Sequence, residues 1–98
     1  MYPSYMYYVY ITTNPGHTTL YVGVTNNLEE RIDQHYNNRG NPQTYAGRYH
    51  CYYLIYFETY PHPYEAILRE KEIKKWSRVK KEKLIATSNP AWRVIPTH

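Results

Sequence analysis

Five side chains in the sequence have the chemistry needed to hydrolyse a phosphodiester bond. Glu70 carries a carboxylate, which can hold a hard divalent cation that lowers the pKa of bound water and offsets charge developing on a phosphate. Arg31 carries a guanidinium, which can stabilise equatorial phosphate oxygens. A phenol or an imidazole can move a proton, and the candidates for that step are Tyr10, Tyr21 and His35.

Each of these residues also has an interpretation without catalysis. Arg31 and His35 are four residues apart on one predicted helix, a spacing that fits either a surface pair or a positively charged ridge aimed at a phosphate. Tyr10 and Tyr21 fit ordinary aromatic residues of a sheet. Glu70 points to the packed side of its helix and needs a partner, which can be an arginine such as Arg31, a divalent cation or water.

A hairpin is expected to position the two tyrosines. Residues 7–12 and 20–25 are rich in aromatic and β-branched side chains and predict two strands, joined through a turn at Pro15 and Gly16. The period of two along each strand places Tyr10, Tyr21 and Gly23 on one face, opposite a shared apolar face.

The remaining elements are predicted to complete a small sheet covered by helices. A helix from residue 28 to about 36 follows N-cap asparagines, and the polar loop 37–50 has a length typical of functional loops. The near-continuous apolar run at 51–59 predicts a third strand in a central position. Helices are expected at 63–76 and 78–86. The order β-β-α-β-α-α predicts an α/β or α+β fold, with a three-stranded sheet and a single domain over residues 1–98.

The charge is unevenly distributed along the 98 residues. Residues 1–68 carry a net charge of −2 and residues 69–98 a net charge of +6, which together give the overall +4. A basic third of this kind indicates either a polyanionic partner or a solvated helix face. The candidate nucleic-acid contacts are Arg48, Lys71, Lys74, Lys75, Arg78 and Lys81.

Composition excludes several classes of protein. The single Cys51 rules out an internal disulfide framework and a thiolate zinc site, and it fits a reducing cytosol. No apolar run approaches the roughly 20 residues that a membrane span needs, and the N-terminus lacks a signal-peptide pattern. The sequence has no glycine-rich phosphate loop and no cysteine-nucleophile constellation. A cytoplasmic protein without membrane contact is expected.

The motif residues resemble the GIY-YIG nuclease family. Tyr8-Val9-Tyr10, followed by Tyr21-Val22-Gly23, is similar to its signature. Arg31 and His35 lie where that family has its helix arginine and, in many members, a histidine. Residues 65–74 resemble the family helix with the metal-binding glutamate, and residues 74–92 resemble its small stand-alone bacterial members. The chain also resembles the N-terminal nuclease domain of excinuclease C.

This resemblance implies a three-stranded antiparallel sheet flanked by helices, with a single Mg²⁺ or Mn²⁺ held by Glu70. Tyr10 and Tyr21 take the places of the motif tyrosines, one of which activates or positions water. Arg31 would bind the scissile phosphate, and His35 would assist as an acid, a base or a phosphate contact. By position, Gly23 is the motif glycine and Asn89 corresponds to a late asparagine of the family. Which of Tyr10, Tyr21 and His35 moves the proton stays open.

Two departures from the family pattern shape the functional hypotheses. Tyr8 replaces the first glycine of the motif, on the same face as Tyr10, where it could narrow access or stack on a base. The chain shows no separate DNA-targeting domain, so its own basic segment would supply affinity. The leading hypothesis is a metal-dependent endonuclease that cuts DNA by structure and is linked to repair or recombination; the sequence does not decide between DNA and RNA as the substrate. The alternatives are a nucleic-acid-binding module with little turnover and a protein that binds partners through its tyrosines.

Overall fold

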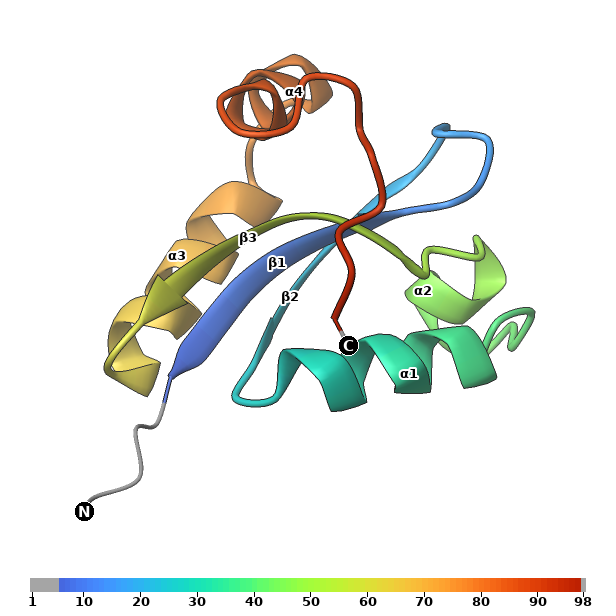
Figure 1. Ribbon diagram of the computed structural model, residues 1–98, viewed down its shortest axis with the longest axis horizontal. Coiled ribbons are helices and arrows are strands. Elements are labelled where there is room, and N and C mark those ends of the chain that lie inside the picture. Colours follow the sequence, from blue (N-terminus) through green and yellow to red (C-terminus); the bar gives the residue numbers. More distant parts are fainter. Residues whose placement is uncertain (1–5, 98) are drawn as a thin grey trace.

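The structure, a computed structural model, describes residues 6–97 and contains one three-stranded antiparallel sheet of order β2-β1-β3. Figure 1 shows the sheet between α1 on one side and α4 on the other. The predicted fold class is confirmed. The elements are β1 (Tyr7–Thr13), β2 (Leu20–Thr25), α1 (Leu28–Asn37), α2 (Tyr45–Arg48), β3 (Tyr53–Tyr60), α3 (Pro63–Lys74) and α4 (Arg78–Ala86).

One face of the sheet forms the main hydrophobic core. Val9 and Ile11 from β1 are fully buried in a cluster with Ala66 and Ile73 from α3 and Ile85 from α4. Burying each large aliphatic side chain contributes about 1.5–3 kcal/mol to stability. This apolar face therefore holds α3 against the sheet at a fixed rotation, and that rotation decides where Glu70 lies.

The opposite face carries the predicted tyrosines. Tyr10 pairs with Gly23 and Thr12 with Tyr21 in the β1–β2 register, so Tyr10, Tyr21 and Gly23 do share one face. Helix α1 lies on this side, and its N-cap Asn27 accepts a hydrogen bond from the Glu30 backbone N–H.

The packing of α1 differs in part from the predicted core stripe. Leu28 and Ile32 are half-buried, whereas Tyr36 is exposed, and no residue of α1 is fully buried. The helix therefore lies over the sheet without closing onto it, which leaves room for a pocket between them.

The prediction that the third strand is central was wrong: β3 is an edge strand, and β1 is central. Leu54 and Ile55 are nevertheless fully buried, because cover lies on both faces of the strand. The C-terminal segment also satisfies β3 carbonyls. The Ile95 N–H donates to Leu54 O and the Asn89 side chain to Ile55 O, each at 2.8 Å. An edge strand protected in this way has the apolar sequence of a central one.

The polar loop predicted at 37–50 contains a short helix, so the element order gains one member. Helix α2 begins after Thr44, whose hydroxyl accepts a hydrogen bond from the Gly47 N–H, and it buries Ala46 over Cys51. Helix α3 ends at Lys74 instead of Trp76. Within the described residues, no helix has both the length and the apolarity to cross a membrane.

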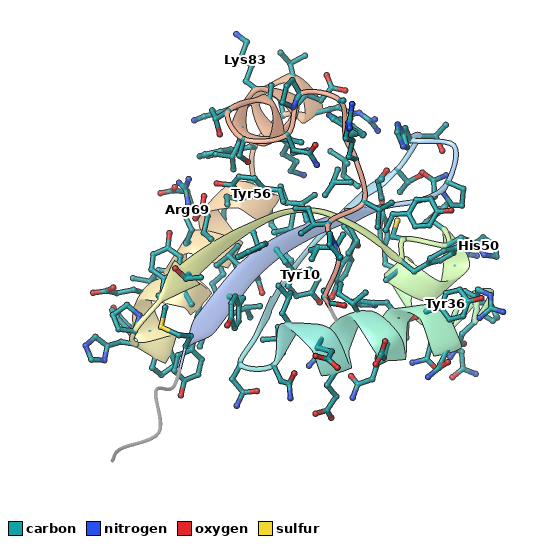
Figure 2. The ribbon with its side chains drawn as sticks, viewed as in Figure 1. Tyr10, Tyr36, His50, Tyr56, Arg69 and Lys83 are labelled. Atoms are coloured by element: carbon teal, nitrogen blue, oxygen red, sulfur yellow. The ribbon has the colours of Figure 1, made fainter. Side chains whose placement is uncertain are left out.

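A buried carboxylate joins β3 to α3. The side chain of Glu58, only 14% exposed, accepts hydrogen bonds from the Tyr56 hydroxyl, the Tyr60 hydroxyl at 2.7 Å, and Arg69 Nε and Nη2 at 2.9 and 3.0 Å. Tyr56 and Arg69 lie close together in Figure 2. Burial alone would raise the pKa of Glu58, but the hydrogen bonds from Arg69 and the two phenols outweigh it and lower that pKa.

We expect Glu58→Ala to lower the free energy of unfolding by about 2–3 kcal/mol, because it leaves the Arg69 guanidinium and two phenols without their acceptor. The stabilisation is present above the ordinary glutamate pKa of 4.5 and is lost as pH falls through the lowered pKa of the folded state. Urea unfolding at pH 7 and at pH 3.5 measures both effects. Glu65→Ala, an exposed acid of α3, is the control; equal stability of the two variants at pH 7 would contradict this role.

Candidate active site

The ring of Tyr10 lies directly over the backbone of Gly23. Tyr10 is fully buried, and a Cβ atom added at Gly23 would approach Tyr10 Cζ to 2.5 Å and Cε1 to 2.8 Å. Such distances are far inside van der Waals contact, so any other residue at position 23 would displace the ring. The absence of a side chain at Gly23 therefore provides the space that the Tyr10 ring occupies.

A hydrogen bond joins Tyr10 to α1. Its hydroxyl oxygen lies 2.8 Å from His35 Nε2, and which group donates depends on the imidazole tautomer. Figure 2 shows Tyr10 between the sheet and α1. The His35 ring also meets Tyr21 edge-on, with 5.2 Å between ring centroids. The sheet and α1 thus bring Tyr10, Tyr21 and His35 together, as the sequence predicted.

Burial sets the protonation of this pair. Burial, and then the neighbouring Tyr21, raises the pKa of Tyr10 well above the ordinary phenol value. Burial, and then the positive charge of Arg31, lowers the pKa of His35 to about 4. At neutral pH the phenol keeps its proton and the imidazole is uncharged. Of the two interpretations of this pair, a ridge with charge on both residues does not fit, because His35 is uncharged at neutral pH; Arg31 is the cation of the two.

Arg31 lines a pocket of about 190 Å³ beside these rings. The residue is half-buried, and among the described residues it makes no ion pair or side-chain hydrogen bond. A half-buried guanidinium with unused donors suits a phosphate or a carboxylate of a ligand. The pocket is lined by Tyr21, Arg31, Gln34, His35, Asn38, Thr44, Tyr45 and Ala46.

Glu70 faces the same region from α3. Its side chain is 14% exposed, and its Oε1 lies 3.3 Å from the ammonium of Lys74 one turn later. The charge of Glu70 contributes to raising the pKa of Tyr10, and Lys74 Nζ lies 6.0 Å from the ring centroid of Tyr21. The protein partner of Glu70 is therefore Lys74 and not Arg31.

The donor set at Glu70 fits one particular class of cation. Among residues 6–97 no group of three or more His, Cys, Asp or Glu side chains could enclose a metal. Mg²⁺ does not require such a cage, because it keeps several waters and binds through one or two carboxylates together with substrate phosphates. Glu70 does not line the Arg31 pocket, but its charge acts on Tyr10; a single, largely buried carboxylate of this kind fits Mg²⁺ or Mn²⁺ and does not fit zinc.

The predicted nucleic-acid contacts separate into three groups. Lys74 and Lys81 line one groove of about 260 Å³ with Tyr21 and Tyr45. Arg78 donates hydrogen bonds to the backbone oxygens of residues 17 and 18 and pairs with Glu82, so it also holds the β1–β2 turn. The others are exposed on the surface and lie outside this groove: Arg48, Lys71 and Lys75.

Two further motif residues lie away from the pocket. Tyr8 is on the face of Tyr10, as predicted, but it packs edge-on against Phe57 and lines a different hollow, so it does not narrow access to Arg31. Asn89 donates to Ile55 O and Arg93 O and accepts from the Arg93 N–H. Its contacts in this structure are those of a residue that docks the C-terminal segment.

Sequence reasoning missed five residues that line the pocket, one of which is Ala46 inside α2. Gln34 and Asn38 come from the end of α1, and Thr44 and Tyr45 from the start of α2. The available signal was the long segment 37–50 and the run Tyr45-Ala-Gly-Arg-Tyr49 inside it. Its aromatic ends indicate more than a polar loop.

The antiparallel sheet and its tyrosine pair are those of a GIY-YIG catalytic domain, and residues 6–83 match the model of that domain. The chain belongs to the GIY-YIG family, whose members are nucleases. It is 43% identical over 84 residues to a UPF0213 protein of Clostridium perfringens, with 86% of this chain and 87% of that protein covered. A UPF0213 protein of Natronomonas pharaonis is 39% identical over 80 residues, with 82% of this chain and 91% of that protein covered.

A solved structure agrees with the fold. The solution NMR structure of a UPF0213 protein from Bacillus halodurans superposes with a TM-score of 0.55 at 31% identity and covers 89% of each chain. The names of these relatives describe no activity. Family membership therefore indicates a nuclease and a nucleic-acid substrate, while the details of the reaction are matters for proposal.

We expect Gly23→Ala to lower the free energy of unfolding by about 1–3 kcal/mol, since the new methyl group must displace the buried Tyr10 ring. Gly16→Ala is the matched control, because a Cβ there meets its nearest neighbour at an ordinary 3.8 Å. Urea unfolding of both variants measures the difference. An equal free energy of unfolding for Gly23→Ala and the wild type would show that the Tyr10 ring does not pack against Gly23.

Proposed function

We propose that this chain is a divalent-metal-dependent endonuclease that hydrolyses phosphodiester bonds in DNA. One observation carries the proposal: Arg31, half-buried and without an ion pair within residues 6–97, lines the same pocket as His35, whose ring is hydrogen-bonded to Tyr10 and is uncharged at neutral pH. The pocket thus has a group for binding an anion beside a group that can take a proton.

Arg31 binds the scissile phosphate in this proposal. Its guanidinium donates to non-bridging oxygens, and those hydrogen bonds strengthen as negative charge builds up during attack. The absence of a competing ion pair at Arg31, among the residues described, leaves its donors available for this task. The pocket, with a volume of about 190 Å³, has room for a phosphate group beside this guanidinium.

His35 is the proposed acceptor of the proton from the attacking water. The raised pKa of Tyr10 keeps the basic phenolate form scarce at neutral pH, and the side chain is fully buried, so water does not reach its oxygen. Tyr10 therefore orients the imidazole: when His35 Nε2–H donates to the Tyr10 oxygen across 2.8 Å, Nδ1 of His35, which lines the pocket, is free to take the proton of the water. Tyr21 packs against both rings and positions them.

Glu70 would hold Mg²⁺ or Mn²⁺. When bound, the cation supplies Lewis-acid stabilisation of phosphate charge and lowers the pKa of a bound water. The protein contributes a carboxylate held at a fixed place by α3 and paired only with the flexible Lys74 side chain among the described residues.

The substrate preference proposed is for DNA structure and not for base sequence. Lys74 and Lys81 in the groove, with the exposed cations of the surface, offer phosphate contacts, which position DNA without reading bases. The rate of cleavage should therefore fall as the salt concentration rises. The proposed substrates are branched, nicked or flapped DNA, as they occur in repair or recombination. The buried, unpaired Cys51 supports a cytoplasmic setting.

A plasmid-nicking assay at low salt with Mg²⁺, Mn²⁺ or EDTA tests the proposal. The wild type should nick only with metal, and Glu70→Ala and Arg31→Ala should each lose at least about 100-fold in rate, because each removes a group that stabilises the transition state. Glu65→Ala, an exposed acid on the same helix, is the matched control and should keep its activity.

The EDTA arm separates the two nucleic-acid hypotheses. Nicking by Glu70→Ala, or nicking by the wild type in EDTA, would contradict the proposed metal chemistry. DNA binding of equal strength with and without metal, together with no nicking of plasmid or branched DNA, would instead indicate a binding module on a nuclease fold.

A further inference from the structure

An exposed aromatic surface adjoins the pocket. The rings of Tyr45 and Tyr49 lie 4.8 Å apart between centroids, and these residues stay 53% and 42% exposed. Tyr45 also stacks with Tyr21, with 6.3 Å between centroids and 28° between planes. The Tyr45–Tyr49 surface therefore extends from the Tyr21 ring of the candidate active site toward the solvent. Phenol rings normally gain stability by burial, so two that remain half-exposed side by side call for a functional explanation.

Tyr45 lies where three hollows meet. It lines the pocket of Arg31 and His35, the groove of Lys74 and Lys81, and a third hollow of about 230 Å³ that Arg78 and Lys81 also line. A chain passing from the pocket into either groove must cross the Tyr45 ring.

The charges that line the three hollows indicate which class of partner binds here. The three hollows are lined by four cationic side chains and by no acidic one. A polyanion that also presents flat aromatic groups is a nucleic-acid strand, whose phosphates suit the cations and whose bases suit tyrosine faces. A neutral apolar peptide would gain nothing from these charges. The cations are Arg31, Lys74, Arg78 and Lys81.

We propose that Tyr45 and Tyr49 form a subsite that stacks one unpaired nucleobase beside the phosphate held by Arg31. This inference rests on the proposed function and names the part of the substrate that the site recognises. A base inside a continuous duplex is covered by its neighbours and cannot reach the rings. DNA with an unpaired nucleotide next to the scissile bond is therefore bound in preference to uninterrupted duplex.

Binding measurements in EDTA test the subsite without cleavage. The probe is a single-stranded DNA oligonucleotide with a fluorescent base analogue whose emission is quenched by stacking. Tyr45→Ala should weaken its binding about tenfold and abolish the quenching, whereas Tyr45→Phe, which keeps the ring, should stay within about twofold of the wild type. Tyr49→Ala should also weaken binding. Tyr64→Ala, an exposed tyrosine at the start of α3, is the matched control and should change nothing.

A fully paired duplex of the same sequence gives the second comparison, and Tyr45→Ala should leave its affinity unchanged. Equal losses on single strand and duplex, or none on either, would overturn the subsite while the proposed nuclease still stands on its own assay. A chain that binds no nucleic acid in any arm would overturn both proposals. Circular dichroism of each variant confirms that the fold is retained.

Discussion

The contact between the Tyr10 ring and the bare backbone of Gly23 is the constraint on which the site depends. Only a glycine on β2 lets the ring lie flat against the sheet, and that position brings its hydroxyl to 2.8 Å from His35 Nε2. The hydrogen bond spans the gap between the sheet and α1, a helix with no fully buried residue to anchor it there. The same gap holds the pocket that Arg31 lines, so one packing contact positions the proton-transfer pair and the anion-binding group together.

Burial then decides what these groups can do. Burial raises the pKa of the Tyr10 phenol and lowers that of the His35 imidazole, and Arg31 adds to the effect on the imidazole, so neither group gains a charge over the neutral range. The neutral His35 and the neighbouring Arg31, which has no ion-pair partner in the part of the chain that the structure describes, take different roles: the imidazole can accept a proton and the guanidinium can bind an anion. A second cation in place of the neutral ring would bind phosphate more tightly and leave no base. From α3, Glu70 adds a carboxylate close enough for its charge to help raise the pKa of Tyr10.

Features that follow from local periodicity could be predicted from the sequence, whereas features that depend on burial under distant segments of the chain could not. The two-residue period placed Tyr10, Tyr21 and Gly23 on one face, and capping signals located α1, because both follow from neighbouring residues. The edge position of β3 was missed because the C-terminal segment, far along the chain, shields Leu54 and Ile55. The neutrality of His35 and the pairing of Glu70 with Lys74 depend on burial and rotamer, which spacing does not encode. Tyr45 was missed because a four-residue helix has too few residues to show a period.

An NMR titration of the His35 imidazole shows whether the Tyr10–His35 pair is buried and neutral. The ring signals of this residue report its charge at each pH without any substrate or metal. The account predicts a neutral ring throughout the neutral range and a pKa near 4, displaced upward in Arg31→Gln because a nearby positive charge is removed. A pKa at or above the ordinary value of 6.5 would show that His35 is solvated or cationic, and it would contradict the buried, neutral Tyr10–His35 pair from which the proposed chemistry follows.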